Sequence, residues 1–153
     1  MPINLETHYK YSENKMDNIL PENKKIVLFD GVCNLCNSSV NFIIERDKYD
    51  VFRFASLQSE IGQKLVSERG LDPAELDSVI LIEPGIAYYR KSSAALEISS
   101  HLSGGYSLLK YFSFLPESFR DGIYNLVANN RYKWFGKEES CSIPTIELKG
   151  KFL

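Results

Sequence analysis

Residues 26–36 read IVLFDGVCNLC, and this stretch decides the fold. The run 26–29 is apolar and has the length of a strand buried on both faces. An Asp-Gly pair, which favours a turn, ends the run. Behind it, apolar residues recur at helical spacing as far as Ile44. The stretch therefore predicts a strand that passes into a helix, with Cys33 and Cys36 at the junction.

The next elements continue the alternation of strand and helix. Residues 51–55 alternate apolar and polar side chains, as a strand does. Residues 58–69 place Ile61 and Leu65 four positions apart among polar side chains. This spacing predicts a short amphipathic helix, which ends at Gly70.

A hairpin and a third helix follow. Residues 79–82 and 86–90 are predicted strands, and the Pro-Gly pair between them suits a type II turn. The next helix is predicted to have Ser92 or Ser93 as its cap and to run to Leu102, before a Gly-Gly pair.

The predicted order is β-α-β-α-β-β-α, which is the thioredoxin-like α/β arrangement. Strands joined through a helix are expected to be parallel, with a right-handed crossover, and the hairpin adds an antiparallel pair. Two further helical segments, marked by apolar residues in 108–112 and 119–127, are expected to pack on the core or cover part of the site. We expect one domain over 25–153 and a polar N-terminal extension over 1–24.

Composition excludes several classes of protein. The chain has 153 residues, with 18 Lys and Arg against 20 Asp and Glu, and shows no basic surplus of the kind that nucleic-acid binders carry. No apolar run approaches the length of a membrane helix, so no membrane partner is expected. The first residues lack the features of a secretory signal, which favours the cytoplasm, where thiols stay reduced.

The cysteine pair carries the predicted chemistry. At a helix N-terminus, the unpaired backbone N–H groups and the helix dipole stabilise a thiolate. We therefore expect Cys33 to be the more exposed nucleophile and Cys36, one turn further in, to be the resolving thiol. No metal or organic cofactor is required, because the redox equivalents reside in the sulfurs.

Two other interpretations stay open at this point. A zinc site built from Cys33, Cys36, Cys141 and His101 is possible, although it lacks the paired spacing typical of zinc ligands. The chain is alternatively a non-catalytic thioredoxin-like binding module, with no turnover.

Asp30 lies three residues before Cys33, at the end of the first strand. It is either a proton acceptor, or a charge that tunes the thiols, or a turn-forming residue that accepts backbone N–H groups.

Three blocks of sequence resemble the DCC family (DUF393) of predicted thiol-disulfide oxidoreductases. The family takes its name from an Asp-Cys-Cys motif, matched here by Asp30, Cys33 and Cys36. The second block is 89–94, in which Ser93 replaces the family's Asp, and the third is 130–136. The resemblance covers about residues 25–153 and implies a thioredoxin-like fold and protein-disulfide reductase activity.

One departure from thioredoxins concerns the expected substrate. Thioredoxins place a cis-proline before the third strand, facing the cysteine pair, whereas this chain has Asp77 and Ser78 there. A disulfide-containing protein or a small thiol such as glutathione is the expected partner. The missing proline favours a small thiol or one dedicated partner over general protein-disulfide exchange.

Five further residues are candidates with a structural alternative for each. Arg131 lies near the thiolate or an anionic substrate group, or it stabilises a helix C-terminus. Ser92 and Ser93 bind a substrate carboxylate or only cap a helix. Trp134 lines the site or belongs to the core. Cys141 is an accessory thiol or an inert buried one.

Overall fold

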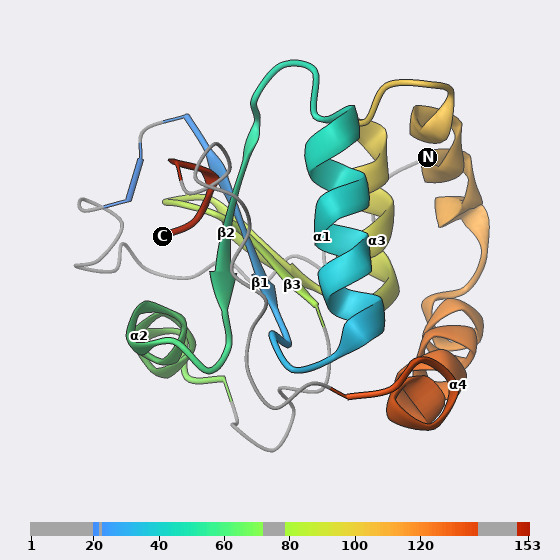
Figure 1. Cartoon of the computed structure of the whole chain (residues 1–153). Helices are drawn as coiled ribbons and strands as arrows, with labels where there is room; N and C mark the ends of the chain where they lie inside the picture. The colour runs from blue at the N-terminus through green and yellow to red at the C-terminus, as the bar shows by residue number, and fades with distance from the viewer. Residues whose placement is uncertain (1–19, 22, 72–78, 138–149) are drawn as a thin grey trace.

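The computed structural model describes residues 20–21, 23–71, 79–137 and 150–153 (Figure 1). Its four strands are β1 (Lys25–Phe29), β2 (Phe52–Ser56), β3 (Ile80–Glu83) and β4 (Ala87–Arg90). The helices are α1 (Asn34–Arg46), α2 (Glu60–Glu68), α3 (Lys91–Ser100), the 3-10 helix η3 (Tyr106–Phe114) and α4 (Glu117–Phe135). The order through α3 is the predicted β-α-β-α-β-β-α.

The strands form one mixed sheet in the order β2-β1-β3-β4. β1 runs parallel to β2, with Val27 opposite Phe54, and antiparallel to β3, with Val27 opposite Leu81. β3 and β4 form the predicted antiparallel hairpin. This mixed α/β arrangement is thioredoxin-like, as the pattern of elements predicts.

The expectation that strands joined through a helix are parallel holds for β1 and β2 and is wrong for β3. A parallel crossover requires the helix to carry the chain back along the sheet. α2 has nine residues and lies beside the end of β2 in Figure 1, so the chain enters β3 from the same end of the sheet and runs in the opposite direction.

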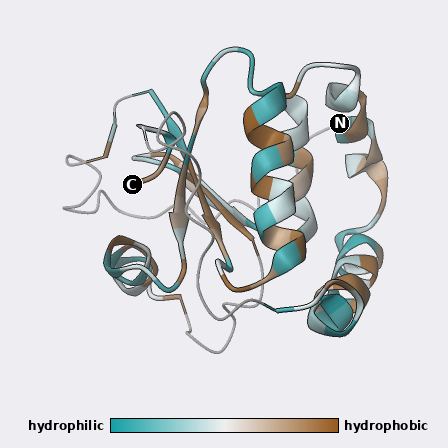
Figure 2. Cartoon of the chain, in the orientation of Figure 1, coloured by the Kyte–Doolittle hydropathy of each residue, from teal (hydrophilic) through white to brown (hydrophobic). Residues whose placement is uncertain are grey.

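The sheet separates two apolar cores, and the strands carry most of their side chains. Figure 2 shows hydrophobic residues, in brown, along the strands of the sheet. One core joins the sheet to α1 and α3 through residues such as Val40, Ile43 and Ile98. The other joins it to α2 through Leu65 and Val66. Because β1 is buried on both faces, its four apolar residues are all buried, as the uninterrupted run predicts.

The hairpin turn has the predicted chemistry. The N–H of Ile86 donates to the carbonyl of Glu83 at 3.0 Å. Gly85 has a φ of 75°, the left-handed value that a type II turn demands at this position. The turn places β4 so that α3 begins at the same end of the sheet as the cysteine pair.

The C-terminal helices cover part of the site, which is one of the two predicted alternatives, but most of their apolar residues do not pack on the core. α4 and η3 form, but Phe119, Ile123, Leu126 and Trp134 are exposed rather than packed on the core. The residues of α4 that face inward lie on another side of the helix. They include Tyr124, Ala128 and Arg131, and they line a cavity. The apolar spacing therefore identified the helix but not the side that packs.

Some predictions lie outside the described residues. These are the structure of residues 1–19, the loop with Asp77 and Ser78, and the position of Cys141. The division into an extension and a domain at residue 25 stays a prediction. Among the helices that the structure describes, none is long and apolar enough to cross a membrane.

Candidate functional site

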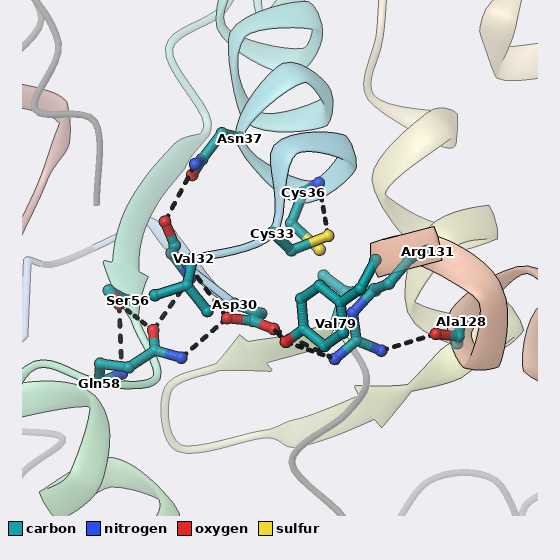
Figure 3. Close-up of polar contacts among 12 residues, drawn as sticks. Asp30, Val32, Cys33, Cys36, Asn37, Ser56, Gln58, Val79, Ala128 and Arg131 are labelled. Atoms are coloured by element: carbon teal, nitrogen blue, oxygen red, sulfur yellow. Dashed lines mark hydrogen bonds and ion pairs between the residues drawn. The ribbon is translucent and has the colours of Figure 1, made fainter. Parts of the chain in front are cut away.

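The cysteine pair lies where β1 passes into α1, as predicted (Figure 3). Cys33 is the N-cap residue of α1 and has extended backbone, with a φ of −91°. Its Sγ accepts the backbone N–H of Cys36 at 3.3 Å. Both cysteines are free thiols in this structure. The sulfur of Cys33 therefore takes the place that a capping oxygen occupies at other helix starts.

The expectation that Cys33 is the more exposed cysteine is wrong. Cys33 is 0% exposed, whereas Cys36 is half-buried. The 135–137 segment, which begins with the last residue of α4, pairs with the backbone of the cysteine loop. Cys33 and Lys137 form an antiparallel bridge. Beside it, the N–H of Asn34 donates to the carbonyl of Gly136 at 3.4 Å, and its Nδ2 donates to the carbonyl of Phe135 at 2.9 Å.

Gly136 is the residue that permits this close approach. Its φ is 87°, in the left-handed region that favours glycine. A Cβ built on it would lie 2.9 Å from Nδ2 of Asn34. The backbone angle therefore favours glycine at position 136, and an added Cβ would also force the side-chain amide of Asn34 to shift.

Asp30 organises the polar side of the site, just beyond the end of β1. Its Oδ1 accepts the N–H of Val32 at 3.1 Å and Nε2 of Gln58 at 2.8 Å. Its Oδ2 accepts Nη2 of Arg131 at 3.1 Å and the hydroxyl of Tyr132. The turn-forming bond to Val32 is thus present, together with a buried ion pair in which the two side chains are 7% and 5% exposed.

The surroundings of Asp30 keep it ionised. Burial alone would raise the pKa of its carboxyl, but hydrogen bonds from Tyr132, Val32, Gln58 and Arg131 outweigh burial and lower it. The pKa of Arg131 is raised: burial opposes the charge, but the bonds to Tyr132 and Asp30 favour it more. The site therefore contains one fixed carboxylate and one fixed guanidinium that neutralise each other.

Cys36 has a different electrostatic setting. Burial raises the pKa of its thiol, and the hydrogen bond and charge of Cys33 raise it further. The positive charge of Arg131 opposes this shift without cancelling it. The thiol of Cys36 is therefore held in its protonated form at neutral pH.

A second set of bonds fixes the loop between β1 and α1. Oε1 of Gln58 accepts the N–H of Gly31 at 2.9 Å and the hydroxyl of Ser56 at 2.6 Å. Nδ2 of Asn37 donates to the carbonyl of Gly31 at 3.0 Å. The end of β2 and the first turn of α1 thus hold the backbone that carries Asp30.

Beside the pair lies a cavity of about 500 Å³, enclosed by α1, α3, η3 and α4. Its walls are mainly aliphatic and aromatic, and Cys36 lies in the wall, next to the Asp30–Arg131 pair. The side chains that line it include Leu35, Cys36, Ile43, Ala95, Ile98, Leu109, Tyr124, Val127 and Arg131.

The serine candidates occupy a different position from the predicted one. Arg90 is the N-cap of α3, so Ser92 and Ser93 fall inside its first turn. The hydroxyl of Ser92 donates to Oδ1 of Asp121 on α4, and its N–H donates to the same oxygen at 3.4 Å. The helix start thus already binds a carboxylate of the protein itself, which occupies the place suggested for a substrate carboxylate.

The remaining candidate residues do not lie together in the structure. The structure brings Arg131 to Asp30, although the two lie a hundred residues apart. Trp134 is 53% exposed, belongs to neither core, and is not among the described residues that line the cavity. It lies on the solvent-facing stripe of α4. Cys141 lies outside the described residues.

The zinc interpretation gains no support from the described residues. No group of three His, Cys, Asp or Glu side chains converges among them. His101 follows α3 and packs edge-on against Phe52, the first residue of β2. It therefore lies at the end of the sheet opposite to the cysteine pair, which removes it from the proposed ligand set.

Sequence reasoning missed several residues of the site. Tyr132 lies next to Arg131 in the third sequence block, so that block held the signal. Gln58 reaches Asp30 because β2, which it follows, pairs with β1, and Asp121 reaches Ser92 through the packing of α4. Nothing in their local sequence distinguishes either residue. Tyr124, whose hydroxyl accepts the N–H of Val79 at 2.9 Å, belongs to the inward stripe of α4.

Comparisons with known proteins show the family to which the chain belongs. The family model of the DCC1-like thiol-disulfide oxidoreductases matches residues 27–137, so the chain belongs to this family.

Two relatives extend the match. The uncharacterized protein YuxK of Bacillus subtilis (strain 168) is 46% identical over 129 residues, which are 84% of this chain and 93% of that protein. A DCC family protein of Arabidopsis thaliana, described as chloroplastic, is 42% identical over 123 residues, which are 80% of this chain and 71% of that protein. No solved structure matches the chain.

Proposed function

We propose that the protein is a thiol-disulfide oxidoreductase of the protein-disulfide reductase type, with Cys33 as nucleophile and Cys36 as resolving thiol. The observation that carries the proposal is the position of Cys33 as N-cap of α1, with its sulfur accepting the N–H of Cys36 at 3.3 Å. A thiolate at this position is stabilised by the hydrogen bond and by the helix dipole.

In this reaction the protein supplies only its two cysteine sulfurs. The Cys33 thiolate attacks a substrate disulfide, a mixed disulfide forms, and the departing sulfur takes up a proton. Cys36 then attacks the sulfur of Cys33, and the second substrate thiol leaves. The two electrons come from the dithiol, which becomes the Cys33–Cys36 disulfide and is regenerated by an external thiol. A disulfide-containing protein as substrate and a small thiol as electron donor suit this scheme, and a reducing cytoplasm favours it.

The buried ion pair positions the reacting loop. Because Asp30 accepts the N–H of Val32, it holds the backbone immediately before Cys33. Its lowered pKa makes it a weak base, so we assign it the role of a fixed charge rather than a proton acceptor. The neighbouring Arg131 balances that charge and limits the rise of the Cys36 pKa.

The burial of Cys33 limits the access of a substrate disulfide to its sulfur. Cys33 has no exposed surface, and the next residue, Asn34, is bonded to the carbonyls of Phe135 and Gly136. We therefore infer that the 135–137 segment moves aside when a protein disulfide reacts at Cys33.

Trapping tests the assignment of roles. The Cys36→Ser variant, incubated with an oxidised protein such as insulin, is expected to accumulate a mixed disulfide on Cys33 that is detected by mass spectrometry. The Cys33→Ser variant serves as the matched control and should accumulate none and reduce no insulin above the buffer rate. Equal trapping by both variants, or trapping by Cys33→Ser alone, would overturn the assigned roles.

A further inference from the structure

The proposed thiol-disulfide exchange gives no role to the cavity beside Cys36. This cavity has a volume of about 500 Å³, within the range of small-molecule sites, and its walls come from three helices and η3. A cysteine in the wall of an apolar cavity places its sulfur within reach of a bound molecule. Cys36 provides that sulfur, whereas Cys33 is not among the described residues of the wall.

The charges around the cavity argue against an ionic ligand such as glutathione. The charged side chains in its wall are Asp30 and Arg131, which pair with each other at 3.1 Å. The nearby start of α3, which is suited to a carboxylate, is occupied by Asp121. A molecule with two carboxylates and an ammonium group would lose its hydration here without gaining counter-charges.

The rim of the cavity favours an apolar body. Leu109 of η3 and Val127 of α4 line the cavity and are also 40% and 36% exposed, so apolar surface continues from the wall to the outside. The hydroxyl of Tyr124 accepts the N–H of Val79, and its own hydrogen can be donated to one polar atom of a ligand. Such a lining fits a neutral molecule with an apolar body and one or two polar atoms.

We propose that this cavity binds a neutral thiol with an apolar body, which reduces the oxidised protein by attacking Cys36. The proposal rests on the thiol-disulfide exchange proposed above and names the class of its electron donor. It assigns the two halves of the cycle to different sulfurs. Protein disulfides react at Cys33, and the donor reacts at Cys36.

The step balances without another reactant. The donor thiolate attacks Sγ of Cys36 in the oxidised pair, a donor–Cys36 disulfide forms, and the Cys33–Cys36 bond breaks. The electron pair stays on the sulfur of Cys33, which the N–H of Cys36 stabilises as leaving group. A second donor thiol attacks the donor sulfur, and Cys36 leaves and takes up a proton. Two donor thiols become one disulfide, and the protein gains two electrons and two protons.

The electrostatics of the pair fit this direction. A sulfur whose pKa is raised by burial and by its neighbour readily takes up the final proton, and Cys36 is such a sulfur. A sulfur at a helix N-cap is the better leaving group, because the charge that develops on it is stabilised. Attack on Cys36 expels the sulfur that the N–H of Cys36 stabilises, whereas attack on Cys33 would expel the sulfur whose pKa is raised.

A series of thiols that differ only in their apolar tail tests the proposal. The probes are N-alkyl-2-mercaptoacetamides with ethyl, butyl, hexyl and octyl tails, and the measurement is the second-order rate of reduction of the oxidised protein. We expect the rate to rise about 2–4-fold per methylene until the cavity is full. Rapid acid quenching and peptide mass spectrometry should find the transient adduct on Cys36.

Two variants test whether the dependence of the rate on tail length arises in the cavity. Ala95→Phe places a large ring at a wall position that is exposed to the cavity, and it is expected to flatten the dependence on tail length. Asn129→Phe adds the same ring at an exposed position of α4 that is not among the described wall residues, and it should keep the dependence. Far-ultraviolet circular dichroism and the rate with dithiothreitol check that both variants are folded.

The outcomes separate this proposal from the proposed function. Equal rates for all tails, or an adduct found on Cys33 alone, would overturn the cavity assignment while leaving disulfide exchange in place. Equal effects of Ala95→Phe and Asn129→Phe would also overturn it. If the protein forms no disulfide under oxidant and reacts with no thiol of the series, both proposals fail together.

Discussion

Cys33 and Cys36 are three residues apart, yet their sulfurs lie in different surroundings. Cys33 precedes the helix with extended backbone, is fully buried, and pairs through its backbone with Lys137. Cys36 is the third residue of α1 and lies in the wall of an apolar cavity. The difference arises because an N-cap residue does not follow the helical rotation of the residues behind it. A single CxxC motif can thereby present two chemically distinct sulfurs.

The Asp30–Arg131 pair lies with Cys36 in the wall of the cavity, and breaking the pair should have the largest effect. We expect Asp30→Asn to lower the free energy of unfolding by about 3 kcal/mol, because it leaves the buried guanidinium of Arg131 without its counter-charge. Urea unfolding measures the loss. The double variant Asp30→Asn/Arg131→Met should lose at least about 1 kcal/mol less than the sum of the single variants. Additive losses would show that the two groups do not interact.

The contribution of the Asp30–Arg131 pair to the free energy of unfolding should depend on pH. The pKa of Asp30 is lowered in the folded protein, so its contribution to stability is fully present above the pKa of an unfolded Asp, near 4. This contribution is lost as the pH falls through the lower, folded value. The stability difference between the natural protein and Asp30→Asn should therefore be constant from pH 7 to about 5 and shrink below about 4. A difference that instead grows in acid would contradict the lowered pKa.

An intermediate effect, confined to the Cys33 side, is expected from Gly136→Ala. The φ of 87° and the 2.9 Å approach to Nδ2 of Asn34 are both unfavourable for a Cβ. The variant should lose about 1–3 kcal/mol of stability. Peptide mass spectrometry after iodoacetamide treatment should show faster alkylation of Cys33, with Cys36 unchanged.

Gly122→Ala is the matched control for this substitution. Gly122 lies inside α4 and a Cβ there meets nothing within 4 Å. This change should stabilise the protein by about 0.5–1 kcal/mol and leave both alkylation rates unchanged. If both glycine variants expose Cys33 equally, the 135–137 segment does not control access to it.

The smallest effect is expected from Asp50→Asn, which concerns a charge remote from both sulfurs. Asp50 interacts with Lys24, Arg53 and Lys151, and its side chain is 46% exposed. Solvent screens such contacts, so the loss should be about 0.5 kcal/mol and should decrease in high salt. Thermal unfolding at two salt concentrations measures it. A loss as large as that of Asp30→Asn would show that burial does not distinguish the two carboxylates.

Much of the fold and part of the site follow from local pattern. The apolar run 26–29, the helix behind Cys33 and the Pro-Gly turn at 84-85 are found where predicted, because each depends on neighbours in sequence. The direction of β3 could not be predicted by the crossover rule, since that rule assumes a helix long enough to return the chain. The facing of α4 could not be predicted either. Its more apolar stripe, with Phe119 and Ile123, faces solvent, while the inward stripe includes the ion-paired Arg131.

The sequence by itself determined that two thiols lie at the start of a helix, since strand, turn and helix signals are contiguous around Cys33 and Cys36. Only the tertiary structure decided which sulfur is enclosed and which lies at a cavity. Those surroundings are built by the 135–137 segment and by α4, about a hundred residues further along the chain. Helical periodicity and capping act over a few residues, whereas burial and pairing depend on what the fold brings together.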